Sequence, residues 1–174
     1  SMAKLRKGVS YSRSIERPYT RKSKYRNKSY VRSSPVCRVT RFDSGNAGGD
    51  FDGKVVLISK ERAQFRHNCL ESARTAVQRA LEKFVTKNEY HFRIKTYPHH
   101  HLRENPLASG AGADRMSTGM KKSFGKVIGL AAQIRPGQEV MEVRVSKRHL
   151  PKAKLALQKA NAKLPTKCQA VIKE

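Results

Sequence analysis

The sequence predicts an α+β fold, a two-layer sandwich in which two amphipathic helices cover one face of a mixed or antiparallel sheet. Two segments with helical periodicity stand among short runs that are typical of strands. The 174 residues suffice for one domain core but not for two. We expect a basic N-terminal arm at 1–34, and a single domain at 35–174 that carries a long functional loop at 98–126.

The domain is expected to begin with a strand at 36–42, where apolar and polar residues alternate. The next residues, 43–53, are rich in glycine, asparagine and aspartate, which tolerate positive φ, so they predict a turn. The apolar, β-branched run at 54–59 predicts a second strand.

A helix is expected after this strand, with Ser59 as its N-cap and Glu61 in its first turn. Its apolar residues fall on one stripe: Leu70, Ala73, Val77, Ala80 and Phe84. Its other face is polar: Arg66, Arg74, Gln78, Arg79, Glu82 and Lys83. His67 and Cys69 are not expected to form a catalytic pair, because residues two apart on a helix point in different directions.

The segment 89–97 alternates cleanly and predicts a strand. One face is apolar and belongs to the core: Tyr90, Phe92 and Ile94. The other face is basic and is expected to be exposed: His91, Arg93 and Lys95. This pattern favours a sheet whose open face meets an anion.

The second half of the domain predicts a hairpin, with strands at 126–134 and 139–145 around a Pro-Gly turn at 135–138. A helix at 149–163 should follow, with Pro151 in its first turn and Pro165 after its end. Its apolar stripe steps by three and four residues: Leu150, Ala153, Leu157, Ala160 and Leu164. A last strand is expected at 168–173.

The net charge points to a polyanionic partner. With 38 Lys and Arg against 13 Asp and Glu, the formal charge is +25, and such an excess destabilises a compact chain in isolation. Nucleic acid is the first candidate and an anionic membrane surface the second. No apolar run reaches the roughly 18 residues that a bilayer requires, and no signal-peptide core is expected. The three cysteines indicate neither a disulfide framework nor a zinc ribbon.

The N-terminal arm is expected to lie along RNA. Residues 1–41 hold thirteen Lys and Arg and one acid, and four tyrosines stand among them. Disordered tails are usually poor in aromatic residues, so the tyrosines favour an arm that stacks on bases while its cations bind phosphates. The expected contact residues are Arg13, Arg17, Arg21, Lys22, Lys24, Tyr25, Arg26, Lys28 and Arg32.

The 98–126 segment has neither a helical nor a strand period, and structureless loops of this length are usually functional. Three adjacent histidines begin it, a spacing that does not place all three on one tetrahedral metal ion. Its G-A-G-A-D-R run lacks the third glycine of a dinucleotide fingerprint. We expect no metal and no cofactor. The small residues would instead let the backbone approach RNA closely.

Four motifs closely resemble one protein family: R-H-N-C-L-E-S-A-R at 66–74, Y-H-F-R-I-K-T-Y-P-H-H-H-L-R-E-N at 90–105, S-G-A-G-A-D-R-M-S-T-G-M at 109–120 and K-K-S-F-G-K at 121–126. The family is the universal large-subunit ribosomal protein called L-ten-e in archaea and eukaryotes, with L-sixteen as its bacterial counterpart. The chain looks like an archaeal-type member, and the resemblance covers nearly its whole length.

The resemblance implies an α/β-hammerhead fold and a structural role in the large ribosomal subunit of the cytoplasm. It implies that the loop extends toward the peptidyl-transferase centre and the tRNA acceptor ends. The residues carried over to the loop are His99, His100, Arg103, Gly110, Gly112, Asp114, Arg115 and Met116, and its further cations are Lys121, Lys122 and Lys126. The implied partners are large-subunit rRNA, tRNA, neighbouring ribosomal proteins and assembly factors, without a membrane.

Two other function classes remain as alternatives. An RNA-processing or RNA-modifying enzyme could use loop histidines or His67 as general acid or base, but such a histidine needs a positioned partner. Only Glu104, Asp114 and a few other acids stand near the loop histidines in the sequence. A peripheral membrane protein would need bulky apolar residues facing lipid, whereas both helical stripes are rich in alanine.

Overall fold

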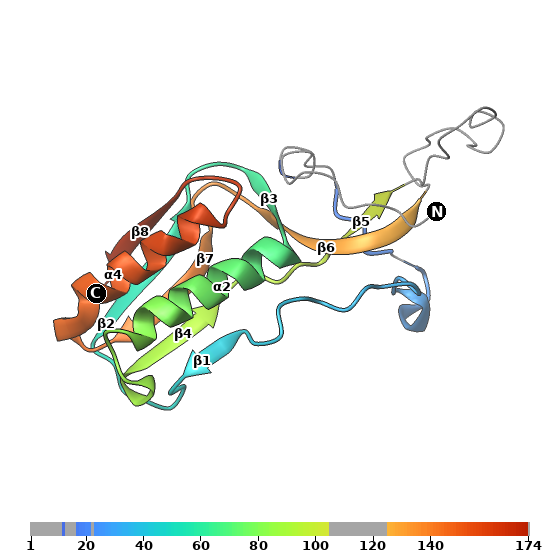
Figure 1. Ribbon diagram of the computed structural model, residues 1–174. Helices are drawn as coiled ribbons and strands as arrows, with labels where there is room; N and C mark the ends of the chain where they lie inside the picture. The colour runs from blue at the N-terminus through green and yellow to red at the C-terminus, as the bar shows by residue number, and fades with distance from the viewer. Residues whose placement is uncertain (1–11, 13–16, 22, 105–124, 174) are drawn as a thin grey trace.

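The computed structural model describes residues 12, 17–21, 23–104 and 125–173, which form two antiparallel sheets and two α-helices (Figure 1). The strands are β1 (Asp43–Gly45), β2 (Gly53–Ser59), β3 (Ala63–Arg66), β4 (Tyr90–Ile94), β5 (His100–Glu104), β6 (Lys126–Ile134), β7 (Glu139–Val145) and β8 (Cys168–Lys173). The helices are α2 (His67–Glu82) and α4 (Leu150–Gln158), with short 3-10 turns at Arg26–Lys28, Lys87–Glu89, Lys147–His149 and Lys159–Ala162.

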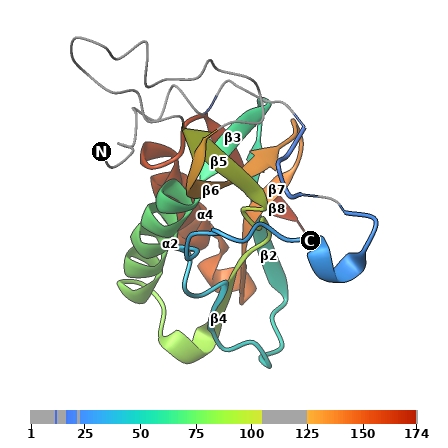
Figure 2. The same ribbon diagram turned by 90° about the vertical axis from the view of Figure 1, so that its right-hand side faces the viewer.

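The larger sheet has the strand order β1-β4-β7-β2-β8, and α2 and α4 lie side by side on one of its faces. The smaller sheet has the order β3-β6-β5. Its long strand β6 leaves the body of the molecule and carries β5 at its outer end (Figures 1 and 2). The α+β class, the antiparallel pairing and the two helices are therefore confirmed, whereas the second sheet was not foreseen.

The centre of the larger sheet agrees with the sequence prediction. The β-branched run Gly53–Ser59 forms β2, which pairs with β7 on one side and β8 on the other. Val55 and Leu57 point into the core beneath the helices and are fully buried. Both neighbouring strands lie where they were predicted, at 139–145 and 168–173.

The strand predicted at 36–42 is wrong. Within 36–42, only Phe42 contacts β4 in this way, through the hydrogen bond from the Ile94 amide to the Phe42 carbonyl at 2.8 Å. Regular pairing with β4 begins at β1, which follows. The segment before Phe42 is extended and buries Val39 in the core. An extended segment that buries one side shows the same alternation of apolar and polar residues as a strand. The alternation alone therefore could not distinguish the two. Within the predicted turn, Gly45 has φ +89°, and a Cβ there would lie 2.2 Å from the Tyr90 carbonyl oxygen.

The predicted start of the first helix is also wrong. Residues 63–66 form β3 and pair with β6, so α2 begins at His67. Ser59 belongs to β2, and its hydroxyl donates to the Glu61 carbonyl instead of capping a helix. Pairing with a strand 65–71 residues away in the sequence overrides the local helical pattern. At the other end the helix stops before Phe84, which is exposed, and Leu81 fills the core in its place.

The predicted hairpin at 126–145 is wrong in its pairing, although both strands exist. The chain turns at 135–138 as expected, with the Gln138 amide donating to the Arg135 carbonyl and Gly137 at φ +78°. However, β6 pairs with β3 and β5, whereas β7 pairs with β2 and β4. The turn therefore carries the chain from one sheet to the other.

The second helix is confirmed in position, with its last turn tightened into the 3-10 segment Lys159–Ala162. Its predicted stripe packs on the core, with Leu150 half-buried and Leu157 fully inaccessible. Contacts with β2, β7 and β8 place this stripe at the centre of the larger sheet.

Leu157→Ala should lower the free energy of unfolding by about 2–5 kcal/mol, because it leaves a cavity where a buried leucine packs. Urea titration measures this change. Leu155→Ala is a matched control, since Leu155 lies on the same helix with 58% of its surface exposed. Equal losses for the two variants would contradict the assigned helix face.

Candidate nucleic-acid interface

The ends of the predicted loop 98–126 form a strand pair. His100–Glu104 is β5 and pairs with β6 in the register His100↔Ala131 to Glu104↔Lys126. The prediction of a segment without strand structure is therefore wrong at 100–104, whereas the strand predicted from 126 is confirmed. Leu102 is buried, and its two neighbours on β5 are half-buried. We call β5 and the outer part of β6 the stem.

Most of the predicted loop tip lies outside the described residues, which exclude 105–124. This applies to Gly110, Gly112, Asp114, Arg115, Met116, Lys121 and Lys122. In the arm it applies to Arg13 and Lys22. The binding roles given to these residues stay predictions.

The stem holds the backbone of the arm at Tyr19. The Tyr19 amide donates to His100 Nδ1 at 2.7 Å, and the His101 amide donates to the Tyr19 carbonyl at 3.1 Å. His101 Nδ1 also lies 3.1 Å from that carbonyl oxygen. Both backbone polar groups of Tyr19 are thus satisfied by two adjacent histidines that are more than 80 residues away in the chain.

Side chains extend the same contact. The Arg103 guanidinium lies 3.8 Å from the centre of the Tyr19 ring, a cation–π geometry. The His101 ring meets Tyr19 edge-on, with centroids 6.3 Å apart, and its Nε2 lies 2.9 Å from the Ser34 hydroxyl. We call Tyr19, Ser34, His100, His101 and Arg103 the arm–stem junction.

Sequence reasoning singled out only His100 and Arg103 from this junction. It treated Tyr19 as one of four similar tyrosines and His101 as one of three similar histidines, and Ser34 carried no signal. The five residues H-H-L-R-E contain one apolar residue, Leu102, and therefore gave little strand signal. No local pattern could have shown which arm residue meets the stem.

The remaining predicted residues lie at two places. Arg17, Arg21, Lys24, Tyr25, Arg26, Lys28 and Arg32 belong to the described arm. There the Lys28 ammonium lies 5.2 Å from the Tyr25 ring centre, and both residues are exposed. Lys126 begins β6 opposite Glu104 at the stem. His99 stands apart from the junction contacts and packs against Tyr97, with ring centroids 4.6 Å apart.

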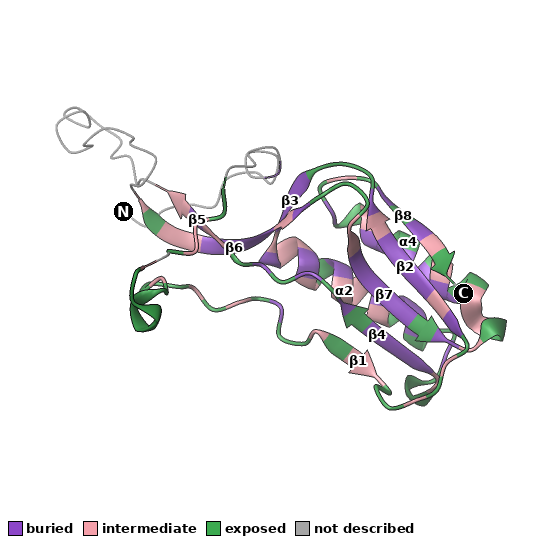
Figure 3. Cartoon of the chain, turned by 180° about the vertical axis from the view of Figure 1, so that it is seen from behind, coloured by how far each residue is buried: buried purple, intermediate pink, exposed green. Residues whose placement is uncertain are grey.

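On the face of the larger sheet that the helices leave uncovered (Figure 3), Arg93 and Lys95 are exposed as predicted, but the face does not offer free cations to an anion. Its cations are paired with acids of the same sheet. Glu142 accepts from Lys54, Lys95 and Arg144 at 3.1–3.3 Å. His91 is buried rather than exposed, and its Nε2 lies 3.0 Å from Asp43 Oδ1.

The ionised carboxylates stabilise this face. Hydrogen bonds from Lys173 and Lys95 lower the pKa of Glu139 to about 2. Burial raises the pKa of Glu142, but hydrogen bonds from Lys95 and Lys54 outweigh it and leave the pKa below its ordinary value. The cations of the uncovered sheet face are therefore paired internally, although five of them share the three carboxylates of Asp43, Glu139 and Glu142.

His67 and Cys69 do not form a nucleophilic pair. Burial raises the pKa of the Cys69 thiol to about 11, and its Sγ donates to the Arg66 carbonyl at 3.0 Å. Burial, together with Arg38 and Arg66, lowers the pKa of His67, whose Nδ1 accepts from the Arg38 amide at 3.3 Å. Both groups serve local structure.

No three His, Cys, Asp or Glu side chains in the described part of the chain come together as a metal ion would require. None of the helices in that part is both long and apolar enough to span a bilayer.

Residues 16–171 match the family described as Ribosomal protein L16p/L10e. The chain is 47% identical over 148 residues to the large ribosomal subunit protein uL16 of Hyperthermus butylicus, which covers 85% of this chain and 79% of that protein. It is 42% identical over 169 residues to the protein of the same name from Staphylothermus marinus, covering 97% and 94%. The corresponding Methanococcus aeolicus protein is 44% identical over 151 residues, covering 87% of each chain.

His100→Ala should raise the exchange rate of the Tyr19 amide hydrogen, because the variant removes its acceptor at the arm–stem junction. One neutral hydrogen bond contributes about 0.5–1.5 kcal/mol, which corresponds to a roughly 2- to 12-fold faster exchange. Amide exchange followed by NMR measures the effect. His99→Ala is the control and should leave the rate unchanged; an equal increase there would refute the assigned contact.

Glu139→Gln should lower stability at neutral pH, because it removes the carboxylate that Lys95 and Lys173 share. The folded pKa of Glu139 is depressed from 4.5 to about 2, so its contribution is complete above 4.5 and is lost as the pH falls toward 2. Thermal unfolding across this range should show the difference from the parent shrinking with acid. Glu61→Gln, at an exposed carboxylate, is the control. A difference that stays constant with pH would contradict the ion pairs.

Proposed function

The chain belongs to the L16p/L10e family of ribosomal proteins, as an archaeal-type member, and we propose that its arm and stem bind large-subunit rRNA while its loop extends toward tRNA. Family membership makes it a structural protein of the large ribosomal subunit in the cytoplasm rather than an enzyme. The enzymatic alternative is dropped on this ground.

The arm–stem junction is the observation that supports this proposal most strongly. It brings arm cations and stem cations to one end of the molecule, beside the base of the loop. The acids of the larger sheet pair with cations on their own sheet face, away from this end. Phosphate contacts made by the arm and the stem would set the orientation of the domain, since such contacts position a protein without reading bases.

The loop is proposed to approach the tRNA acceptor ends at the peptidyl-transferase centre. The support is the family resemblance of the motifs that flank and fill it, and the stem that fixes both of its ends. His100 and Arg103 would belong to the base of this structure, because the junction already engages both. Gly110, Gly112, Asp114, Arg115 and Met116 would form the part nearest tRNA. The predicted hammerhead arrangement and a contact with assembly factors stay part of the proposal.

The tagged chain, expressed in an archaeal cell, should sediment with the large subunit in a sucrose gradient and remain there after a moderate salt wash. Cross-linking from residue 115 should then recover tRNA from ribosomes that carry it. Sedimentation only as free protein or with small RNAs would contradict the proposed binding to the large subunit. Sedimentation with the subunit, but with cross-links to rRNA alone, would remove the tRNA part.

The affinity for an rRNA fragment should fall steeply with salt, because each phosphate contact releases a counterion. If the arm and loop neutralise about 8–12 phosphates, each contact should contribute about −0.7 to −0.9 to the slope of log affinity against log salt. A chain lacking residues 1–34 should show a much shallower slope in filter binding. An unchanged slope would mean that the arm does not touch phosphate.

A further inference from the structure

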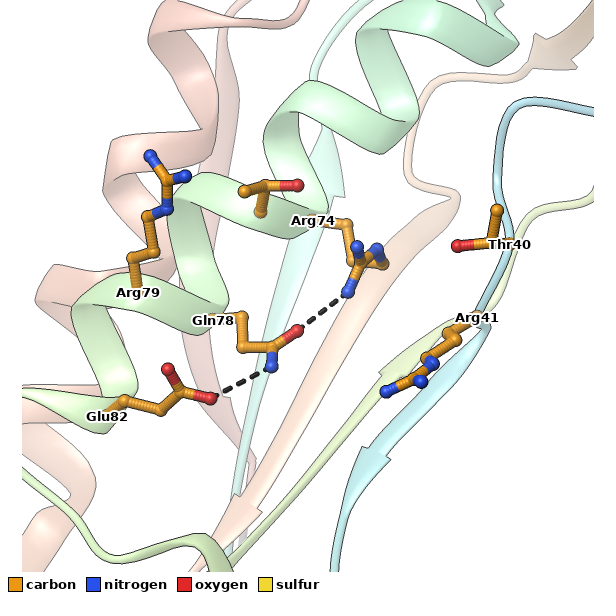
Figure 4. Close-up of a pocket in the computed structure, with 7 residues that line it drawn as sticks. Thr40, Arg41, Arg74, Gln78, Arg79 and Glu82 are labelled. Carbon is orange, nitrogen blue, oxygen red and sulfur yellow. Dashed lines mark hydrogen bonds between the residues drawn. The ribbon is translucent and has the colours of Figure 1, made fainter.

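A cleft of about 390 Å³ lies between the exposed face of α2 and the segment that leads into β1 (Figure 4). Arg41 and Thr40 line it from the segment, and Arg74 and Gln78 line it from the helix. In Figure 4 the Thr40 hydroxyl and the Arg74 guanidinium point toward one another across the gap, and Arg41 extends from below toward the helix. Two guanidinium groups and a hydroxyl from elements that are far apart in the sequence therefore line one cleft.

Arg74 is held in place by a chain of hydrogen bonds along α2. Glu71 accepts from its Nε at 2.9 Å and from its Nη2 at 2.6 Å, and Gln78 accepts from its Nη1 at 2.7 Å. Gln78 in turn donates to Glu82 at 2.9 Å. These bonds use three of the five guanidinium N–H groups, so two remain to donate to a ligand. The ligand would meet a side chain whose conformation is already set.

The two ends of the cleft differ in charge. Glu82 occupies one end, and burial together with this carboxylate raises the pKa of Tyr90 beneath it. Arg41 occupies the other end, is exposed, and has no carboxylate within ion-pair distance among the described residues. An anion would therefore sit between Thr40, Arg41 and Arg74, away from Glu82.

A second cleft continues over the same helix face. It shares Thr75 and Arg79 with the first cleft and reaches Lys163 beyond α4. Arg79 is exposed and, within the described part of the chain, pairs with no acid. Cations spaced along a continuous surface suit a ligand that repeats its negative charge, as a polynucleotide backbone does.

We propose that the cleft formed by Thr40, Arg41 and Arg74 binds a backbone phosphate of RNA, with Arg79 and Lys163 following the same strand. Arginine suits this role because its planar guanidinium matches phosphate oxygens with two parallel hydrogen bonds. Gln78 is a positioning residue that acts through Arg74. The inference rests on the proposed rRNA binding and adds a third contact, on the globular domain, to the arm and the loop.

Phosphate-ethylation interference on a bound large-subunit rRNA fragment tests the proposal. For the parent chain, ethylation at a defined set of phosphates should block binding. With Arg41→Ala, one phosphate or two adjacent phosphates should drop out of this set, and the salt slope should become shallower by about 0.7–0.9. Arg41 is exposed and lies outside the helices and strands, so the variant should fold normally.

Arg148→Ala is the matched control, because it also removes one exposed arginine, but one that pairs with Glu89 at 2.7 Å. It should leave both the interference set and the salt slope unchanged. Gln78→Ala should weaken interference at the same phosphate as Arg41→Ala, since it removes one of the three hydrogen bonds that hold Arg74. An interference set for Arg41→Ala identical to that of the parent would overturn the proposed site while leaving rRNA binding intact. Arg41→Ala could also give the parent's interference set and yet fail to enter the large subunit. That result would indicate that the cleft binds an acidic protein segment rather than RNA, and would also overturn the proposal.

If the parent chain bound no rRNA fragment and showed no interference, the proposed function itself would fail. That result differs from failure of the cleft alone, in which the parent binds and the variant matches it.

Discussion

An excess of 25 positive charges is the constraint on which the rest of this structure depends. The chain has 13 acidic residues, too few to neutralise 38 lysines and arginines within the fold. Several of these acids lie on the larger sheet, between basic side chains that would otherwise repel one another. Glu142, almost inaccessible, is surrounded by three basic side chains, and Glu139 joins Lys95, which follows β4, to Lys173 of β8. The sheet face therefore folds without an external anion, and the unpaired charge lies elsewhere.

The architecture separates the stable body from the charged extensions. β6 belongs to the body at Ile134, where it pairs with β3, and to the stem at Lys126, where it pairs with β5. One continuous strand thus links the core to the base of the loop. The arm reaches the same place through Tyr19, so two segments remote in sequence meet at one end of the molecule (Figure 2). A ligand that fixes the arm would therefore also fix the base of the loop, because the junction connects the two.

Local patterns predicted the elements whose burial is regular. β2, β8 and α4 have apolar residues at strand or helix spacing, and each lies where it was expected. β3 and β5 were missed because four or five residues carry little periodic signal and each depends on pairing with β6. The family resemblance identified the class of protein, but it could not show that His91 is buried against Asp43. Nor could it show that Tyr19 meets His100, since these contacts bridge 48 and 81 residues.

The central claim is that the cations of the sheet face are paired internally, while the arm, the stem and the α2 face remain available to RNA. Lysine acetylation read by mass spectrometry, with and without purified large-subunit rRNA, tests this most directly. The account predicts that rRNA protects Lys24, Lys28 and Lys126, and leaves the reactivity of Lys95 and Lys173 unchanged. Protection of Lys95 and Lys173, with Lys24, Lys28 and Lys126 unaffected, would place RNA on the opposite face and contradict it.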